Sequence, residues 1–194
     1  MIVVISRLYY NKGIDLLVDA FSRIAVRDRR YRLLVAGEPI KEAQHLWSQV
    51  QKAIDQGPVR GQVIQHIEFI GDSEIELYFK GADVLVLPYT EIFQSGVLFM
   101  AYRFGLPVIA TDVGSFGRDI IPGITGYICR PNDPVDLARV IEMYFESDLF
   151  KTLDAQRFNI SNSIQASHSW HIAADKTGEV YAQLLGNNAL RFSA

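Results

Sequence analysis

Short apolar runs alternate with amphipathic segments along most of the chain. The runs are rich in β-branched residues and mostly uncharged, which is typical of strands covered on both faces. We predict six strands, at residues 2–5, 33–36, 67–70, 84–87, 107–110 and 126–129. Apolar positions at helical spacing predict helices between them, over about residues 15–24, 41–55, 72–79, 95–104 and from Pro134 onward. Because strands alternate with helices, the sequence predicts an α/β fold: a Rossmann-like, doubly wound parallel sheet of about six strands with C-terminal helices.

The segment from residue 147 onward breaks this alternation. It contains two helical stretches and no further strand, and His168-Ser169-Trp170 marks the predicted start of the last helix. We therefore expect a Rossmann-like domain over residues 1–146 and a helical tail over residues 147–194 that packs on the same domain. The first predicted strand begins at Ile2, with almost nothing before it, so we also expect that a preceding part belongs to the working protein.

The composition excludes several classes of protein. The 194 residues carry 19 Lys+Arg and 22 Asp+Glu, a formal net charge of −3, so no global electrostatic attraction to nucleic acid is expected. The single cysteine, Cys129, cannot form an internal disulfide, which favours a reducing cytoplasm. No apolar run approaches the roughly 20 residues of a membrane span. These features indicate an ordinary globular protein with no nucleic-acid partner.

Two cations follow the first predicted strand. Arg7 and Lys12 lie in a polar loop that leads into a helix, at the edge where open α/β sheets bind their ligands. Arginine offers a planar fork to phosphate oxygens and lysine a point charge, so the pair is a candidate diphosphate cradle. The alternative is that both are solvated loop charges, and the residue types alone leave both interpretations open.

A second loop with candidate chemistry follows the fourth predicted strand. It carries Glu91 and then Gln94-Ser95-Gly96 at a helix start, where unpaired backbone N–H groups can bind an anion. The alternative is an ordinary capped helix, with Ser95 as the N-cap and Gly96 present for close packing. Glu91 is either a solvated charge or an acceptor for a ligand hydroxyl.

Several familiar site motifs are absent from the sequence. No G-x-G-x-x-G follows the first strand and there is no P-loop, so the motifs most typical of dinucleotide binding and of nucleotide hydrolysis are missing. The four histidines lack the HExxH-like spacing of a zinc site, and we expect no metal to be bound.

Several ordered motifs resemble those of a known family. They are Ile5-Ser6-Arg7-Leu8 with Lys12-Gly13-Ile14-Asp15, Ala82–Pro88, Gly105–Gly114, Gly123–Gly126 with Arg130-Pro131-Asn132-Asp133, and Ser169-Trp170. In order and spacing they are similar to motifs of the C-terminal, donor-binding domain of retaining GT-B glycosyltransferases of the family 4, or glycosyl transferases group 1, type. The resemblance covers residues 2–185.

This resemblance implies a function and roles for the candidate residues. The chain would be the donor-binding half of a retaining, hexosyltransferase-type enzyme that moves a sugar from a nucleoside-diphosphate sugar to an acceptor. Arg7 and Lys12 would be catalytic, because they would neutralise the diphosphate as it departs, without a metal or other cofactor. The donor would also be bound by the second loop, through Glu91, Gln94, Ser95 and Gly96.

The resemblance also implies partners outside this chain. The acceptor, a sugar, a lipid-linked molecule or another compound, would bind mainly to an N-terminal domain that this chain does not contain. The 194 residues alone would then be inactive. The full enzyme would act in the cytoplasm in polysaccharide or glycoconjugate biosynthesis, and it could associate peripherally with a membrane.

One stretch departs from the family pattern. The Glu-x7-Glu signature of the family places its first glutamate at Ile92, one position after Glu91, and its second at Met100. A methionine cannot accept hydrogen bonds from ribose hydroxyls as a carboxylate does. The departure motivates an alternative function, a non-catalytic Rossmann module with a degenerate sugar-nucleotide site that acts in interaction or regulation. A nucleotide-sugar epimerase shares this architecture, but its catalytic carboxylates and histidine cannot be placed in this chain.

Overall fold

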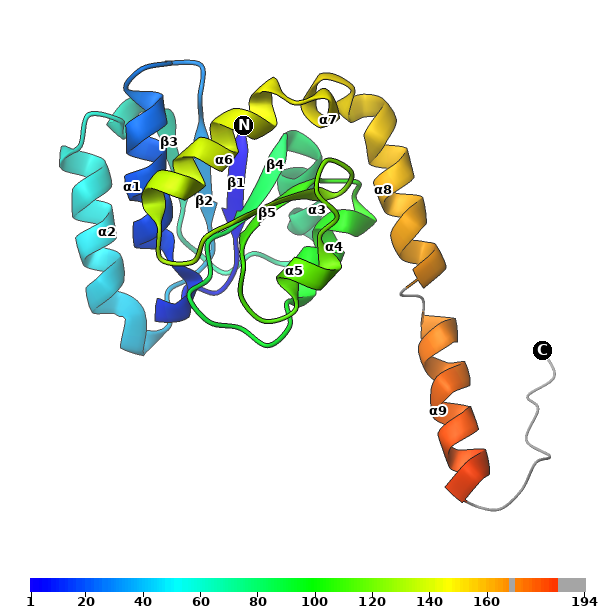
Figure 1. Ribbon diagram of the computed structural model, residues 1–194. Coiled ribbons are helices and arrows are strands. Elements are labelled where there is room, and N and C mark those ends of the chain that lie inside the picture. The colour runs from blue at the N-terminus through cyan, green and yellow to red at the C-terminus, as the bar shows by residue number, and fades with distance from the viewer. Residues whose placement is uncertain (168–169, 185–194) are drawn as a thin grey trace.

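A six-stranded parallel sheet forms the centre of the molecule (Figure 1). The computed structural model describes residues 1–167 and 170–184. The strands are β1 (Ile2–Ile5), β2 (Leu33–Ala36), β3 (Val63–His66), β4 (Val84–Leu87), β5 (Val108–Thr111) and β6 (Gly126–Cys129). Their order in the sheet is β3-β2-β1-β4-β5-β6, which confirms the predicted Rossmann-like, doubly wound α/β fold.

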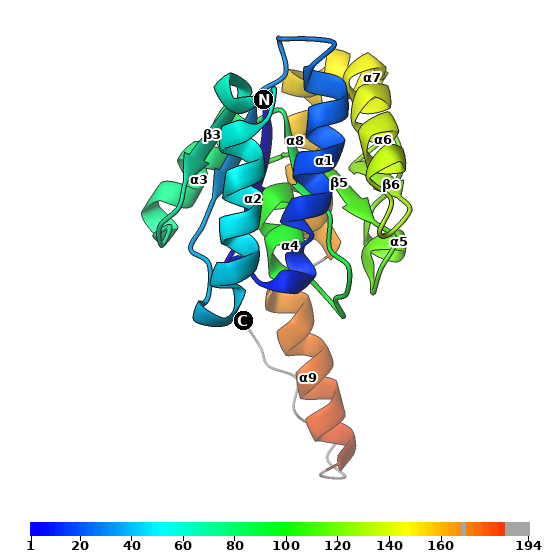
Figure 2. The ribbon, with the colours of Figure 1, turned by 90° about the vertical axis from the view of Figure 1, so that its left-hand side faces the viewer.

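Helices cover both faces of the sheet. They are α1 (Ile14–Ala25), α2 (Gln44–Gln56), α3 (Asp72–Gly81), α4 (Gly96–Arg103), α5 (Phe116–Asp119) and α6 (Pro134–Glu146), with single 3-10 turns at Tyr10–Lys12, Lys41–Ala43 and Arg60–Gln62. α1 packs between α2 and α6 on one face, and α3 and α4 lie on the other (Figures 1 and 2). The apolar spacing of α1 explains its orientation, because Leu17, Phe21 and Ile24 are fully buried in the core.

The third strand differs from the prediction. We expected it at residues 67–70, but β3 is Val63–His66, which pairs with β2 at the edge of the sheet. An edge strand is only partly covered, so its residues need not be apolar: Gln65 and His66 are half-buried, and Ile64 is exposed. The apolar residues at 67–70 instead form a loop at the end of β3.

Three helices follow α6: α7 (Asp148–Lys151), α8 (Leu153–Ser167) and α9 (Trp170–Leu184). α8 packs against α4, whereas α9 extends away from the sheet in both views (Figures 1 and 2). Trp170 begins α9, while His168 and Ser169 of the predicted helix start, and residues 185–194 of the predicted tail, lie outside the described residues. The division at residues 146 and 147 stays a prediction. Within the described ranges, no helix combines the length and the apolar character needed to cross a membrane.

Candidate functional site

The candidate residues follow two neighbouring strands at one edge of the sheet. In the order 3-2-1-4-5-6, the chain proceeds from β1 to one side and from β4 to the other, so a crevice opens between their C-terminal ends. The loop after β1 carries Arg7 and Lys12. The loop after β4 carries Glu91, Gln94, Ser95 and Gly96. Ligands of open α/β sheets bind at this switch point.

The two loops are held together by Asn11. Its backbone carbonyl accepts a hydrogen bond of 3.0 Å from the Thr90 N–H, and its side-chain amide donates one of 3.0 Å to the Glu91 carbonyl. The turn after Asn11 also approaches the end of β4 closely. Gly13 has a φ of +60°, and a Cβ there would lie 1.9 Å from the Pro88 carbonyl oxygen. Only glycine fits at that position, and the loops therefore have a defined separation.

Lys12 is the half-buried cation of the site. Its ammonium nitrogen lies 3.8 Å from the centre of the Tyr89 ring. Burial raises the pKa of Tyr89 to about 12, so the ring is neutral near pH 7 and the contact is a cation–π interaction. Burial also lowers the pKa of Lys12 from its ordinary value of 10.5. Among the described residues, no carboxylate forms an ion pair with Lys12.

Arg7 is the exposed cation of the site. It lies just beyond β1, where the chain runs beside the loop after β2: the Leu8 N–H donates to the Glu38 carbonyl at 3.0 Å. Within the part of the chain that the structure describes, its guanidinium makes no ion pair or hydrogen bond. A planar group with five donors and no protein partner is available to a phosphate.

The start of α4 offers backbone donors to the same crevice. Ser95 occupies the N-cap position and is 4% exposed, but its side chain makes no capping hydrogen bond. A Cβ built on Gly96 would meet nothing within 4 Å, so the first residue of the helix faces open space. Ser95 is therefore the N-cap by position, yet the first N–H groups of α4 have no side-chain cap and can bind an anion.

The Glu91 and Gln94 side chains are exposed beside this helix start. Neither makes a side-chain hydrogen bond or ion pair with another described residue. Their loop is rigid on its far side, because the Ser115 N–H donates to the Phe93 carbonyl at 3.1 Å, and a Cβ on Gly114 would lie 2.1 Å from the Ile92 carbonyl oxygen. The loop can therefore present free polar groups at fixed positions.

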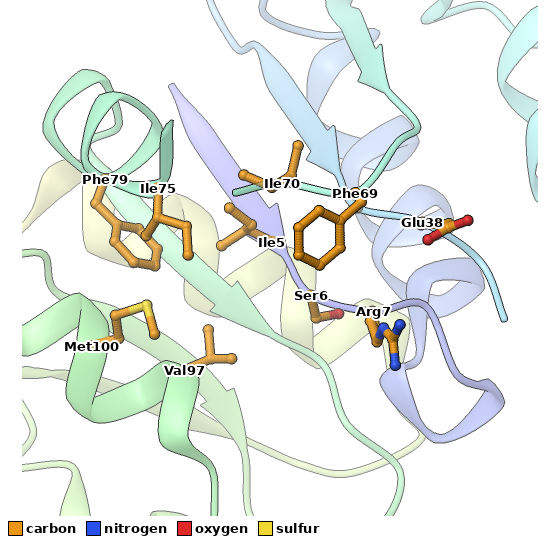
Figure 3. Close-up of a pocket in the computed structure, with 11 residues that line it drawn as sticks. Ile5, Ser6, Arg7, Glu38, Phe69, Ile70, Ile75, Phe79, Val97 and Met100 are labelled. Carbon is orange, nitrogen blue, oxygen red and sulfur yellow. The ribbon is translucent and has the colours of Figure 1, made fainter. Parts of the chain in front are cut away.

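A mainly apolar cavity of about 140 Å³ adjoins Arg7 (Figure 3). It is lined by Ile5, Ser6, Arg7, Gly37, Glu38, Phe69, Ile70, Ile75, Phe79, Val97 and Met100. Arg7 and Glu38 lie at one end, and Phe79 and Met100 at the other (Figure 3). The position where the family pattern has its second glutamate is thus a thioether in the wall of this cavity.

Sequence reasoning missed the loop after β3 as part of the site. Phe69 and Ile70 line the cavity, and Phe69 is 67% exposed. The apolar residues were visible in the sequence but indicated a strand. The hydrophobic pattern of the sequence does not indicate that the phenylalanine side chain is exposed at the sheet edge.

Among the described residues, no group of three or more His, Cys, Asp or Glu side chains is arranged to hold a metal ion. The expectation that the reaction needs no metal or other cofactor stays a prediction.

Comparisons with known proteins agree with this architecture. A sequence model of the family described as "Glycosyl transferases group 1" matches residues 1–147. The gpi3 subunit of phosphatidylinositol N-acetylglucosaminyltransferase from Schizosaccharomyces pombe is 31% identical over 196 residues, covering 98% of this chain and 40% of that protein.

Two solved structures have a similar fold. Anabaena Alr3699/HepE in complex with UDP gives a TM-score of 0.82 at 18% identity and covers 94% of this chain and 48% of that one. The C-terminal domain of LpcC, a glycosyl transferase group 1 family protein from Francisella tularensis, gives a TM-score of 0.75 at 19% identity, covering 87% and 86%. The chain therefore spans less than half the length of the gpi3 subunit and of HepE. Because the family match covers most of its length, this chain belongs to the glycosyl transferases group 1 family, whose members are GT-B glycosyltransferases.

Proposed function

We propose that this chain binds the diphosphate of a nucleoside-diphosphate sugar between β1 and β4, as the donor-binding part of a retaining glycosyltransferase. One observation carries the proposal. Arg7 and Lys12, which have no carboxylate partner among the described residues, lie at the same sheet edge as the uncapped start of α4. A diphosphate binds where cations and unpaired backbone N–H groups face the same crevice.

The chemistry follows from the charges. When the bond between the sugar and the diphosphate breaks, negative charge develops on the departing nucleoside diphosphate. Arg7 donates a fork of N–H groups to these oxygens, Lys12 supplies a half-buried charge, and the N–H groups of Ser95 and Gly96 complete the contact. These groups stabilise the transition state without a metal or other cofactor. Glu91 and Gln94 contact the donor sugar or an adjacent phosphate.

The nucleoside of the donor occupies the cavity beside Arg7. Its apolar walls suit the flat face of a base, and the wall formed by Val97 and Met100 of α4 leads to the helix start that binds the diphosphate, so the ribose lies along α4. The HepE structures, which share this fold, contain UDP or UDP-glucose, which supports a nucleotide sugar as the ligand here.

The acceptor, a sugar, a lipid-linked molecule or another compound, binds to a part of the enzyme that this chain does not contain. We therefore expect no turnover from these 194 residues alone. The full enzyme acts in the cytoplasm in polysaccharide or glycoconjugate biosynthesis, can associate peripherally with a membrane, and has no nucleic-acid partner.

Isothermal titration with UDP, GDP and ADP tests the diphosphate site. Arg7→Ala and Lys12→Ala should each weaken binding of the preferred nucleotide by about tenfold or more, since a hydrogen bond to a charged group contributes about 1.5–3 kcal/mol. Lys52→Ala, at an exposed lysine of α2, is the matched control and should bind as the parent does. Unchanged affinity in both site variants would refute the assignment.

Met100 supports a second candidate function. Because a thioether lines the cavity where the family pattern has a carboxylate, the chain could be a Rossmann module kept for interaction or regulation, with a degenerate nucleotide site. A thermal-shift screen separates the two, because a ligand specific for the folded form raises the melting temperature. The absence of any shift with UDP, GDP and ADP at millimolar concentration favours the second function.

A further inference from the structure

Three polar side chains form a hydrogen-bonded chain across the loop that joins β3 to α3. The Tyr78 hydroxyl in α3 bonds to Nδ1 of His66 at the end of β3, and Nε2 of His66 bonds to the Glu68 carboxylate in the loop. The rings of His66 and Tyr78 also stack, with centroids 5.6 Å apart and planes inclined by 28°. We call these three residues the β3–α3 brace.

The chemistry of the groups sets the direction of each hydrogen bond. The Glu68 carboxylate can only accept, so Nε2 of His66 carries the proton that faces it. In a neutral imidazole, Nδ1 is then the acceptor, and the Tyr78 hydroxyl donates to it. Both ring nitrogens of His66 thus have a suitable partner, and the imidazole orientation is fixed from both sides.

The loop depends on side chains for its conformation. In the stretch from 67 to 70, which the structure describes completely, no residue makes a backbone–backbone hydrogen bond. The ends of the loop are tied, because the Gly37 N–H donates to the His66 carbonyl at 3.0 Å and the Gly71 N–H donates to the Glu74 carboxylate at 3.2 Å. Between these ends, the brace and the packing of Ile67 and Ile70 against the core hold the chain.

The same loop supplies one wall of the cavity beside Arg7. Phe69 and Ile70 line it opposite Val97 of α4, and Phe69 lies toward the Arg7 and Glu38 end (Figure 3). Phe69 is 67% exposed, so its own burial does little to fix its position. A ring that is to stack on a flat ligand must be held by something else.

We propose that Tyr78, His66 and Glu68 are positioning residues that hold the Phe69–Ile70 wall against the nucleoside of the donor. The proposal rests on the proposed function, since it assumes that the nucleoside occupies this cavity. The residues that bind the diphosphate are held independently of the brace. Lys12 and the start of α4 are held by Asn11, Gly13 and Gly114 on other loops, and Arg7 lies between Ser6 and Leu8, whose N–H groups donate to the Ala36 and Glu38 carbonyls. Loss of the brace should therefore weaken nucleoside contacts and spare the phosphate contacts.

Tyr78→Phe tests the brace most cleanly, because it removes one hydroxyl and keeps the ring that stacks on His66. Isothermal titration is carried out with UDP, GDP, ADP and inorganic pyrophosphate on both proteins. We expect about fivefold weaker binding of whichever nucleotides the parent binds, the effect of one lost hydrogen bond, with pyrophosphate affinity unchanged. Glu68→Ala, at the other end of the brace, should likewise lower the ratio of nucleotide affinity to pyrophosphate affinity. Tyr31→Phe is the matched control, because Tyr31 lies just before the N-terminal end of β2, at the opposite edge of the sheet.

The outcomes separate this proposal from the proposed function. If the parent binds neither the nucleotides nor pyrophosphate, the proposed function fails and the brace proposal fails with it. If the parent binds nucleotides and Tyr78→Phe binds them equally well, only the brace proposal is overturned. A parallel loss of nucleotide and pyrophosphate affinity, or a lowered melting temperature with no change in their ratio, also overturns it, because either result indicates a merely structural role.

Discussion

Lys12 and Tyr89 join the loop after β1 to the loop after β4, with the ammonium nitrogen 3.8 Å from the ring centre. The buried ring replaces part of the water that a lysine normally keeps, and it offers no negative charge in exchange. The Tyr89 ring therefore holds the Lys12 ammonium in position without neutralising its charge. An anionic ligand can supply the counter-charge, so ligand binding should depend on the protonation of Lys12.

Nucleotide affinity should fall as the pH rises through the lowered pKa of Lys12, that is, before pH reaches the ordinary lysine value of 10.5. The sign follows from linkage, because a bound diphosphate stabilises the protonated lysine and deprotonation opposes binding. Without ligand the unfolded chain holds the proton more tightly, so this group makes stability rise with pH over the same window. Titrations of UDP, GDP and ADP between about pH 7 and pH 10 measure the effect.

Lys12→Arg supplies the control for this pH dependence. A guanidinium stays charged throughout the range, so the alkaline loss of affinity should largely disappear. Lys52→Arg, on the exposed surface of α2, should keep the parent profile. If the parent and Lys12→Arg lose affinity in parallel, then Lys12 does not contact the anion.

Gly96→Ala should separate binding from stability. A Cβ at this position meets no atom within 4 Å, and alanine favours a helix over glycine by up to about 1 kcal/mol, so the melting temperature should stay equal or rise. The methyl group would, however, occupy the open space in front of the first N–H groups of α4. Calorimetry should therefore show severalfold weaker nucleotide binding by a protein of undiminished stability. Full affinity in this variant would mean that the phosphates bind elsewhere.

Several central strands could be predicted because they are buried on both faces. β1, β2 and β4 are buried at every position, so their apolar runs could be read directly. β3 lies at the sheet edge, where partial burial permits Gln65 and His66, and the apolar run just after it was interpreted as the strand. Burial in a cavity wall and burial in a sheet select the same residue types, and a linear pattern does not separate them.

The candidate cations and the helix start could be located because they directly follow predicted strands, and strand ends mark the ligand edge. The contacts that hold these residues in place could not be predicted from the sequence. Asn11 reaches Glu91 across 80 positions of sequence, and Tyr78 reaches His66 across 12. Such contacts depend on how closely the loops approach in the folded chain, which no local propensity encodes.

Gly105→Ala should destabilise the fold by at least about 2 kcal/mol, because a non-glycine residue at positive φ is strained and the added methyl forces α8 to move. Gly105 has a φ of +67°, and a Cβ there would lie 2.3 Å from the Arg157 carbonyl oxygen of α8. Gly61 has open space around its Cβ and no positive φ, so Gly61→Ala should change stability by no more than about 0.5 kcal/mol. Urea unfolding of both variants measures the difference. Equal stabilities would show that α8 does not pack on the turn before β5 as described.

Met100→Glu should strengthen the binding of nucleotides that carry a ribose diol. Met100 is 37% exposed in the cavity wall, so a carboxylate placed there stays hydrated and ionised before the ligand arrives. It can then accept hydrogen bonds from both hydroxyls, and a single such bond to a charged group corresponds to about tenfold in affinity. Met100→Gln is the control, because it has nearly the same shape without the charge. Calorimetry with UDP, GDP and ADP and with their 2′,3′-dideoxy analogues should show a gain for Met100→Glu that is confined to the natural nucleotides. A gain of equal size with the dideoxy analogues would show that the ribose does not face Met100, and the nucleoside would then have to occupy the cavity in another orientation.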